Sequence, residues 1–398
     1  MGTRLDVPSR TPQHRRRTGP KVIVGRAGEP WPTDPHDVGP RRCPERRLAH
    51  RPDACPCPCK VCTPYRFADV VTRAAVWDLG SSSFHLLVCE VGQAGTLVPA
   101  LRRRALLNLG VAVGATGSIP ADRVTAAVTA SKRMRKALER QGADVTVALA
   151  TAALRDAANG AAVVARIERA IGTTVRTLDG AEEARLCFVG QRAGVWTGDR
   201  VSFGLDLGGG SLEVAVGDAH RVALSTSVAV GAARLRGELA TGDPLTAREV
   251  ASVRARTAEA LMPVRAALRA HRGATARAVV SGGTARALAR LATARARRHT
   301  SPEQGEVNQV ELPAEQVEEL AQRLAGLELS QRLALPGVSA RRAPALSIGA
   351  LILASTAHVL EVEHFVVSEW GLREGALIDE LTAQGRGAAW AALAPTAR

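Results

Sequence analysis

Two short stretches of the sequence combine an aspartate with a turn of small residues. The first reads D-L-G-S-S-S-F at residues 78–84, and the second reads D-L-G-G-G-S-L-E at residues 206–213. Because glycine has no Cβ, the backbone N–H groups of such a turn can converge on phosphate oxygens. An aspartate at the end of the preceding strand can hold Mg²⁺ against the same phosphate. A single turn of this kind is better explained as a hairpin without a ligand, but its repetition favours phosphate.

These turns predict specific ligands. Asp78 and Asp206 are the candidate metal ligands, and Glu213 joins them because it points to the same side of its strand as Ser211. The phosphate would lie against Gly208, Gly209, Gly210 and Ser211.

A third loop, S-G-G-T at residues 281–284, follows an apolar segment and opens a predicted helix. The N–H groups and the positive dipole end of a helix start attract anions. Gly282, Gly283 and Thr284 are therefore further phosphate candidates, although Thr284 also fits as a simple helix cap.

Two more segments carry charges suited to phosphate chemistry. Arg155, in A-T-A-A-L-R-D at 150–156, can clamp phosphate with two N–H groups, or pair with Asp156 at the surface. In D-G-A-E-E-A-R at 179–185, Glu182 and Glu183 lie at a predicted helix start. They are either ordinary partners of the helix dipole, or one enters a cleft and accepts a proton from an attacking water.

The two D-L-G turns lie 128 positions apart, and each joins two apolar strands. This duplication predicts two similar α/β domains whose turns face each other across a cleft. The expected boundaries are 71–196 for the first domain and 197–385, with a C-terminal helix, for the second. Residues 386–398 are expected to form a loose tail. The predicted strands are 74–79, 84–91, 100–109, 145–150, 174–178, 201–207, 212–217, 222–228, 276–280 and 365–367. The predicted helices are 120–141, 160–171, 181–195, 246–270, 284–296, 313–324, 340–361 and 372–382.

The first 70 residues are rich in proline and arginine and show no sustained hydrophobic period, which predicts disorder. They contain C-P-C-P-C-K-V-C at 55–62, where four thiolates can hold zinc, but the spacing is tighter than in usual zinc pairs. Cys89 and Cys187 lie in apolar segments and are expected to be buried free thiols.

The net charge of +15 suits an anionic partner, although plain solubility is the favoured explanation of the charge by itself. The apolar stretch 347–360 is too short to span a bilayer and predicts a buried helix, and no secretory signal is evident at the N-terminus. A cytoplasmic protein is expected. The arginines between 286 and 298 are expected to form the solvated face of a helix rather than a polyanion site.

Seven collinear blocks within residues 72–382 resemble the exopolyphosphatase/guanosine-pentaphosphate phosphohydrolase (Ppx/GppA) family of the actin and sugar-kinase superfamily. They are the segments 78–84, 150–156, 180–186, 206–213, 230–235, 281–288 and 370–375. The resemblance implies two actin-like (ribonuclease H-like) domains with an interdomain cleft. It implies hydrolysis of terminal phosphoanhydride bonds of polyphosphate or pppGpp, with Mg²⁺ as the metal and Mn²⁺ as the alternative.

By this resemblance, Glu183 is the general base, Asp206 and Glu213 position the metal or the phosphate, and Arg155 neutralises charge. Gly208, Gly209, Gly210 and Ser211 cradle the terminal phosphoryl group, and the opposite wall is formed by Ser81, Ser82 and Ser83.

The sequence departs from the family pattern at two positions, and it resembles the short two-domain form of the family, without the extra domains of long members. Ser82 replaces the usual asparagine, and the family's R-A-D is here R-A-P at 342–344. A short form is expected to favour short polyphosphate chains or guanosine polyphosphates. The alternatives are a non-catalytic sensor that binds these compounds, and an actin-fold kinase, which nothing in the resemblance supports. No membrane or specific nucleic acid partner is expected, and the sequence leaves a homodimer open.

Overall fold

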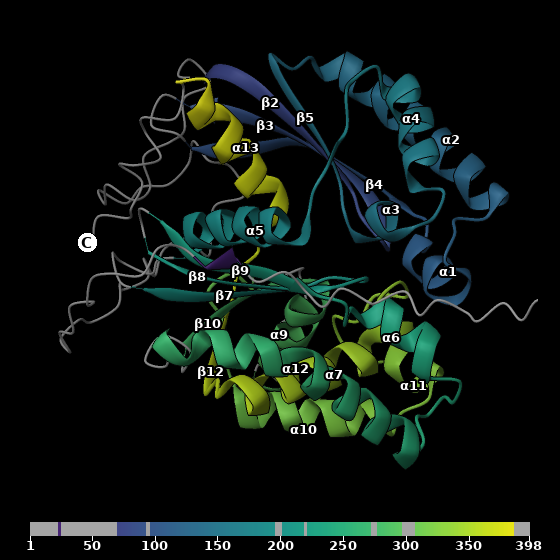
Figure 1. The fold of residues 1–398 in the computed structure, drawn as a ribbon, viewed down its shortest axis with the longest axis vertical. Helices are drawn as coiled ribbons and strands as arrows, with labels where there is room; N and C mark the ends of the chain where they lie inside the picture. Colours follow the sequence, from purple (N-terminus) through teal and green to yellow (C-terminus); the bar gives the residue numbers. More distant parts are fainter. Residues whose placement is uncertain are drawn as a thin grey trace, which may run out of the picture.

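A computed structural model describes residues 23–24, 70–92, 96–195, 201–218, 221–271, 277–296 and 307–385. These residues form two β-sheets, one in the upper and one in the lower half of Figure 1, each covered by helices. The C-P-C-P-C-K-V-C segment and the tail 386–398 lie outside the described residues.

The first sheet is built around β2 (Val70–Leu79), which pairs antiparallel with β3 (Ser83–Gly92) and parallel with β5 (Val145–Ala150). β4 (Leu97–Leu106) extends it beyond β3, and β6 (Arg176–Thr177) extends it beyond β5. The amphipathic helices α2 (Ala121–Gln141) and α4 (Gly160–Ile171) pack on each other and bury an apolar cluster against the sheet.

The second sheet repeats this order around β7 (Ser202–Leu207). β7 pairs antiparallel with β8 (Leu212–Gly217), which pairs with β9 (Val222–Val228), and on its other side it pairs parallel with β10 (Arg277–Gly282). β12 (His364–Val367) and β11 (Glu311–Pro313) complete that side, and β1 (Ile23–Val24) pairs with β9. Because both sheets share one strand order, the prediction of two actin-like domains is confirmed. Ile23 and Val24 are the exception to the disorder predicted for residues 1–70, of which 1–22 and 25–69 lie outside the described residues.

The helices α7 (Ala247–Ala267), α9 (Gly283–Ala296), α10 (Ala314–Ala325) and α12 (Ala343–Leu360) belong to the second domain. Within the described residues, α12 alone is long and apolar enough to cross a membrane, but 83% of it is buried inside the protein. It is therefore the buried core helix predicted for this segment, and a capping box at Thr246 starts α7 as expected.

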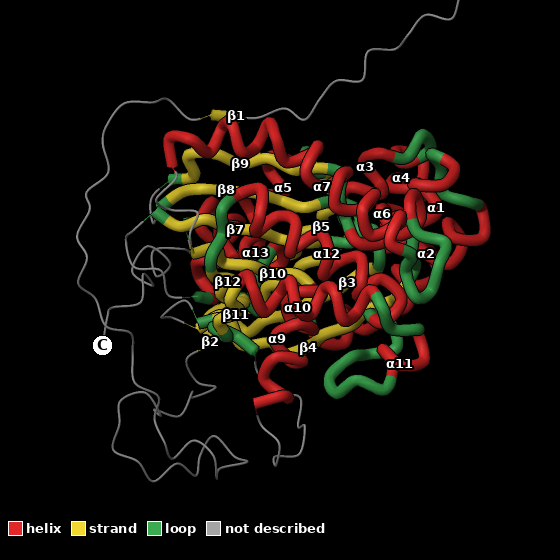
Figure 2. The backbone as a smooth tube through the Cα atoms, turned by 90° about the horizontal axis from the view of Figure 1, so that it is seen from below, coloured by secondary structure: helices red, strands yellow, loops and turns green. Residues whose placement is uncertain are grey.

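Four short helices were not predicted: α1 (Leu109–Thr116), α3 (Ala152–Asp156), α6 (Ala232–Leu239) and α11 (Leu329–Leu333). A 3-10 turn, η4 (Leu268–His271), also follows α7. In the turned view of Figure 2, α1, α3 and α6 gather at one end of the strands, where α1 of the first domain contacts α6 of the second. Short helices lack the two or three turns over which a hydrophobic period becomes visible in a sequence.

Two helices, α5 (Gly180–Gly194) and α13 (Leu372–Ala383), lie in the layer between the sheets (Figure 1). α5 follows the first sheet in the chain but packs on β7, β8 and β9, whereas α13 follows the second sheet but packs on β2 and β5. The two helices also pack on each other. Each helix therefore packs on the sheet of the domain that lies across the expected boundary. Both Cys89 and Cys187 are buried free thiols, as predicted.

Candidate active site

The two aspartate turns face each other across a cavity of about 160 Å³. We call residues 80–82, between β2 and β3, the first turn, and residues 208–211, between β7 and β8, the second turn. A Cβ on Gly210 would lie 2.5 Å from Ser81 Oγ, and one on Gly209 would overlap Ser82 Oγ. Glycine in the second turn is therefore what allows the two turns to approach this closely.

The start of α6 fixes the second turn from behind. The backbone N–H of Ala232 donates to Gly208 O at 3.1 Å, and the N–H groups of Ala233 and Arg234 both donate to Gly209 O at 2.9 Å. The Nε of Arg234 donates to Gly210 O at 2.8 Å. All three glycine carbonyls are thus held on the α6 side. The N–H groups of Gly209 and Gly210 make no backbone hydrogen bond within the described residues, so they remain as donors for an anion.

The first turn is held in the same manner by the start of α1. Gly110 N donates to Ser81 O at 2.8 Å, and Leu107 N and Asn108 N donate to Ser82 O at 3.0 Å. The side chain of Ser81 also accepts a hydrogen bond from Ala153 N at 3.1 Å. The two turns therefore share one construction, in which a short helix from the same domain takes up the turn's carbonyl groups.

Six carboxylates line the cavity: Asp78, Glu183, Asp206 and Glu213, which were predicted as site residues, and Glu369 and Glu374, which were not. Burial raises the pKa of Asp78 to about 6, with Arg373 opposing the shift. Burial and the charge of Asp206 raise the pKa of Glu213 to about 7. Burial also raises the pKa of Asp206, and the thiol of Cys187, which donates to Asp206 Oδ2 at 3.2 Å, opposes that shift. Such crowding of buried acids indicates a site that receives positive charge from elsewhere.

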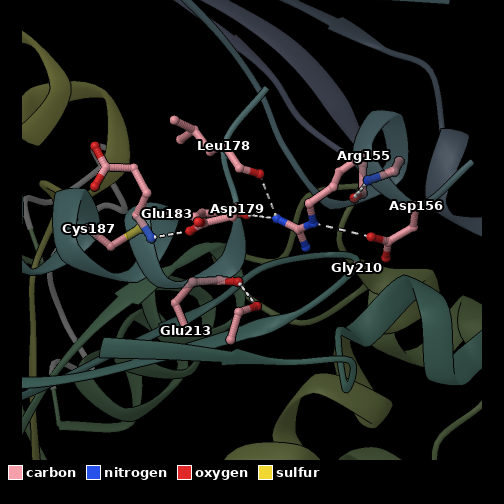
Figure 3. A network of polar contacts seen from close by, with 12 residues as sticks. Arg155, Asp156, Leu178, Asp179, Glu183, Cys187, Gly210 and Glu213 are labelled. Atoms are coloured by element: carbon pink, nitrogen blue, oxygen red, sulfur yellow. Dashed lines mark hydrogen bonds and ion pairs between the residues drawn. The ribbon is translucent and has the colours of Figure 1, made fainter. Parts of the chain in front are cut away.

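Glu183 lies in the first turn of α5, which is capped by Asp179. Its side chain is buried, and its Oε2 accepts a hydrogen bond from Arg155 Nη1 at 2.9 Å (Figure 3). Burial, followed by the neighbouring Glu213, raises the pKa of Glu183 well above its usual value, and Arg155 opposes the shift. The adjacent Glu182 instead pairs with Arg185 and does not line the cavity. Of the two neighbouring carboxylates, it is Glu183 that enters the cleft.

The donor set around the cavity suits a hard divalent cation. Asp78, Asp206 and Glu213 offer carboxylate oxygens, which Mg²⁺ prefers. Within the described ranges, no three His, Cys, Asp or Glu side chains converge tightly enough to form a metal cage by themselves. Mg²⁺ is commonly held by one or two carboxylates plus water and substrate phosphate, so the residues present fit that mode of binding.

Four arginines form the opposite charge pattern on the cavity wall. This arginine wall consists of Arg104 on β4, Arg286 on α9, Arg342 before α12 and Arg373 on α13. Among the described residues none of the four forms an ion pair within 4.0 Å. The guanidinium of Arg342 lies against the Cα of Gly283, where a Cβ would overlap it, and its buried Nε has no partner in the described structure. Unpaired guanidinium groups on a cavity wall favour an anionic ligand.

His85 links this wall to the first turn. Its Nδ1 lies 3.4 Å from Arg373 Nη1, and its Nε2 lies 2.8 Å from Ser83 Oγ. Because an arginine only donates, Nδ1 must accept, so Nε2 carries the proton and donates to Ser83. The hydroxyl hydrogen of Ser83 is then available to a ligand. Burial and then Arg373 lower the pKa of His85 to about 2, which keeps the ring neutral.

The structure gathers most of the predicted site residues at one cavity. The predicted residues that line it are Asp78, Ser81, Ser82, Ser83, Glu183, Asp206, Gly208, Gly209, Gly210, Ser211, Glu213, Gly282 and Gly283. Thr284 is buried against Gly349 of α12, and Arg155 reaches Glu183 rather than the cavity itself. Whether each residue acts as predicted stays a prediction.

The interpretation of Arg286 as part of a solvated helix face was wrong. β10 ends at the cavity edge and α9 begins at once, so a residue in the first turn of α9 faces the cavity. Arg286 is half-buried there, and its Nη1 donates to Glu369 O at 3.2 Å. Arg104, Arg373 and His85 had been given no role. The G-L-R-E-G block at 371–375 contains Arg373 and is the signal from which its role could have been predicted.

Comparison with known proteins identifies the family of this chain. The sequence pattern of the Ppx/GppA phosphatase family matches residues 88–384. The chain belongs to the Ppx/GppA phosphatase family. A curated Ppx/GppA relative, exopolyphosphatase 1 of Mycobacterium tuberculosis, is 32% identical over 319 residues, which are 80% of this chain and 90% of that protein. Exopolyphosphatase 2 of the same species is 30% identical over 317 residues, covering 77% of this chain and 97% of that protein.

Solved Ppx/GppA structures share the fold. An exopolyphosphatase from Cytophaga hutchinsonii superposes with a TM-score of 0.71 at 24% identity, covering 79% of this chain and 98% of that one. The Ppx/GppA family member from Aquifex aeolicus gives a TM-score of 0.64 at 26% identity, again covering 79% and 98%. The duplicated domains and the cleft between them are therefore those of the Ppx/GppA fold.

Proposed function

We propose that the protein is a Mg²⁺-dependent exopolyphosphatase that releases orthophosphate from the end of inorganic polyphosphate. The observation that carries the proposal is the facing pair of turns with Glu183 buried beside them and the arginine wall close by. The curated relatives named exopolyphosphatase support the substrate class. pppGpp presents the same terminal phosphoanhydride and is the second substrate to assay.

The terminal phosphoryl group would lie on the second turn, where the N–H groups of Gly209 and Gly210 stabilise its oxygens. Ser83 donates from the opposite wall, and the arginine wall holds the phosphates behind the terminal one. When bound between Asp78, Asp206 and Glu213, Mg²⁺ supplies positive charge that offsets the repulsion between carboxylates and phosphate.

Glu183 would act as the general base. Its raised pKa brings it closer to the range in which a carboxylate accepts a proton efficiently near neutral pH. It takes a proton from water while the water oxygen attacks the terminal phosphorus. The bond from that phosphorus to the bridging oxygen breaks, orthophosphate leaves, and the chain is one phosphate shorter.

The test is phosphate release from polyphosphate and from pppGpp, side by side, with and without Mg²⁺. Glu183→Gln should lower kcat on the order of 1,000-fold while tripolyphosphate still binds in calorimetry. Glu182→Gln is the matched control, because that carboxylate lies outside the cavity, and it should keep the wild-type rate. A wild-type protein that binds tripolyphosphate but releases no phosphate would instead be a sensor.

Chain-length preference is measured in the same assay with triphosphate, short chains and long chains at equal concentrations of chain ends. We expect a preference for short chains or pppGpp over long chains. Equal rates per chain end would contradict that expectation.

A further inference from the structure

Arg234, in the first turn of α6, makes contacts that bridge the two domains. Its backbone N–H donates to Gly209 O at 2.9 Å, and its Nε donates to Gly210 O at 2.8 Å, both in the second turn. Its Nη2 reaches Asp156 Oδ2 of the first domain at 2.7 Å. The Arg234 side chain is only 16% exposed, so these contacts lie in a partly desolvated setting.

Asp156 in turn contacts a second guanidinium. Its Oδ1 lies 3.2 Å from Arg155 Nε, and Arg155 Nη1 donates to Glu183 Oε2 at 2.9 Å (Figure 3). A continuous polar chain therefore runs from the second turn to Glu183: Gly210 O, Arg234, Asp156, Arg155, Glu183. We call these contacts the polar chain.

Asp156 also solves an electrostatic problem. The Asp156 carboxylate lies between the guanidiniums of Arg155 and Arg234, which would otherwise repel each other. Without it, Arg155 keeps its bonds to Leu178 O and Glu183 but loses the contact that fixes its Nε. The direction in which Arg155 presents itself to Glu183 would then be less restricted.

We propose that Arg234 and Asp156 are positioning residues that hold the second turn and Glu183 in register across the domain boundary. Neither residue lines the cavity, so neither contacts the substrate directly. The inference rests on the proposed function, because the second turn is where the terminal phosphoryl group is placed and Glu183 is its base. A displacement of about 1 Å between the two costs on the order of 100-fold in rate.

A simple surface ion pair makes a different prediction. Exposed pairs contribute little to stability, and Asp156 is 34% exposed, so loss of the pair alone should leave kcat unchanged. A positioning role lowers kcat and leaves KM nearly constant, because the arginine wall, which is proposed to hold the phosphates behind the terminal one, stays in place.

The experiment measures phosphate release from polyphosphate for Asp156→Asn, Arg234→Met, Arg234→Lys and the Asp156→Asn/Arg234→Met double variant. Arg234→Met should lower kcat on the order of 100-fold, with KM within about threefold of wild type. Asp156→Asn should lower kcat about tenfold. The kcat of the double variant should be no lower than that of Arg234→Met alone, because the two substitutions interrupt the same polar chain. Arg234→Lys should fall between, since it keeps the charge for Asp156 without the planar fork.

Arg254→Gln is the matched control. It removes an arginine that pairs with Glu318 through both guanidinium nitrogens between α7 and α10, away from the cavity, and it should retain wild-type kcat. If Arg234→Met does not fold, Asp156→Asn still tests the chain, because every backbone contact of the second turn remains.

Hydrogen exchange supplies a readout that does not need activity. In Arg234→Met the amides of residues 208–211 should exchange faster than in wild type and in Arg254→Gln. A wild-type protein without phosphatase activity would overturn the proposed function. The exchange rates would still test whether the polar chain holds the second turn in place. Active Arg234→Met and Asp156→Asn variants with wild-type kcat and unchanged exchange would overturn this inference alone.

Discussion

The two aspartate turns share a backbone plan but differ in what surrounds them. In both, an aspartate ends the central strand and a short helix binds the carbonyls of the turn. Across the hairpin from Asp78 lies His85, which is next to Arg104 and Arg373. Across from Asp206 lies Glu213, which is near Glu183. Across the hairpin from its aspartate, the first unit therefore places a histidine beside two arginines, whereas the second unit places one carboxylate near another. The arginine wall itself is shared, because Arg286 and Arg342 belong to the second domain.

The difference extends to the chemistry of the turns themselves. The first turn offers serine hydroxyls, whereas the second offers glycine N–H groups without side chains. Hydroxyls rotate and adapt to several ligands, while backbone N–H groups are fixed in direction. From this comparison we expect substrate binding to depend more on the first turn and its neighbours, and the rate to depend more on the second turn.

Among the substitutions that compare the two turns, the largest effect should come from Gly231→Ala. A Cβ at this position would overlap the backbone of Gly210, and backbone cannot rotate away, whereas its φ of −74° suits alanine. We expect kcat to fall on the order of 100-fold because the second turn must shift. Gly110→Ala, the corresponding glycine behind the first turn, meets Ser81 Cβ at 3.0 Å and should mainly raise KM.

Steady-state phosphate release distinguishes the two variants. Gly326→Ala is the control, since its nearest neighbour would be 3.8 Å away, and it should behave as wild type. If Gly231→Ala changed KM and kcat to the same extent as Gly110→Ala, the expected difference between the two turns, one acting on KM and the other on kcat, would be contradicted.

Next in size is Arg286→Gln. Removing one guanidinium of the arginine wall should raise KM for polyphosphate about tenfold and change kcat less, because a charged hydrogen bond to the substrate is lost. Arg290→Gln, one turn further along α9 and away from the cavity, should leave KM unchanged. KM measured at low and high salt checks the charge contribution. Equal effects of the two substitutions on KM would contradict the role of Arg286 in binding and would favour the solvated helix face.

A smaller effect is expected for His85→Phe. It removes the donor to Ser83, whose hydroxyl then no longer has a fixed direction, so KM should rise about threefold. Because the pKa of His85 is lowered to about 2, the variant should keep the wild-type pH profile between pH 5 and 8. A profile that lost a titration step near pH 6.5 would show that His85 carries charge in the working enzyme.

The smallest effect concerns stability against pH without metal. The raised pKa values of Asp78, about 6, and Glu213, about 7, mean that the folded state binds protons more tightly than the unfolded chain. Their contribution to stability is therefore full at low pH and is lost as pH rises through 6 to 7. Calorimetry should show the Tm falling on the order of 5 °C between pH 5 and 8.

Mg²⁺ should raise the Tm more at pH 8 than at pH 5, because it binds the ionised carboxylates. Asp78→Asn should flatten part of the pH dependence. A Tm that rose with pH in the absence of metal would contradict the raised pKa values of Asp78 and Glu213.

Much of this architecture could be predicted from the sequence because it depends on local patterns of apolar and turn-forming residues. The strands 145–150, 212–217 and 222–228 were predicted to the residue, since apolar runs ended at clear turns. That Asp78, Asp206 and Glu183 belong to one site followed from motifs that depend on neighbours in the chain.

The arginine wall could not be predicted because its members come from four separate elements. Arg104 reaches the cavity only through its pairing opposite His85, and Arg342 only because Gly283 leaves room for its guanidinium. The exchange of α5 and α13 between the domains was likewise hidden, because the apolar faces of a helix do not specify which sheet they will cover.

The exchanged position of α5 decides what happens if the domains move apart. Glu183 is carried by a helix that rests on the sheet of the second turn, although it follows the first sheet in the chain. A hinge opening would therefore carry Glu183 along with the second turn. Asp78, Arg155 and Asp156 would move away with the first sheet, so the opening must break the Arg155–Glu183 and Arg234–Asp156 ion pairs. Closure would restore both contacts before the next turnover.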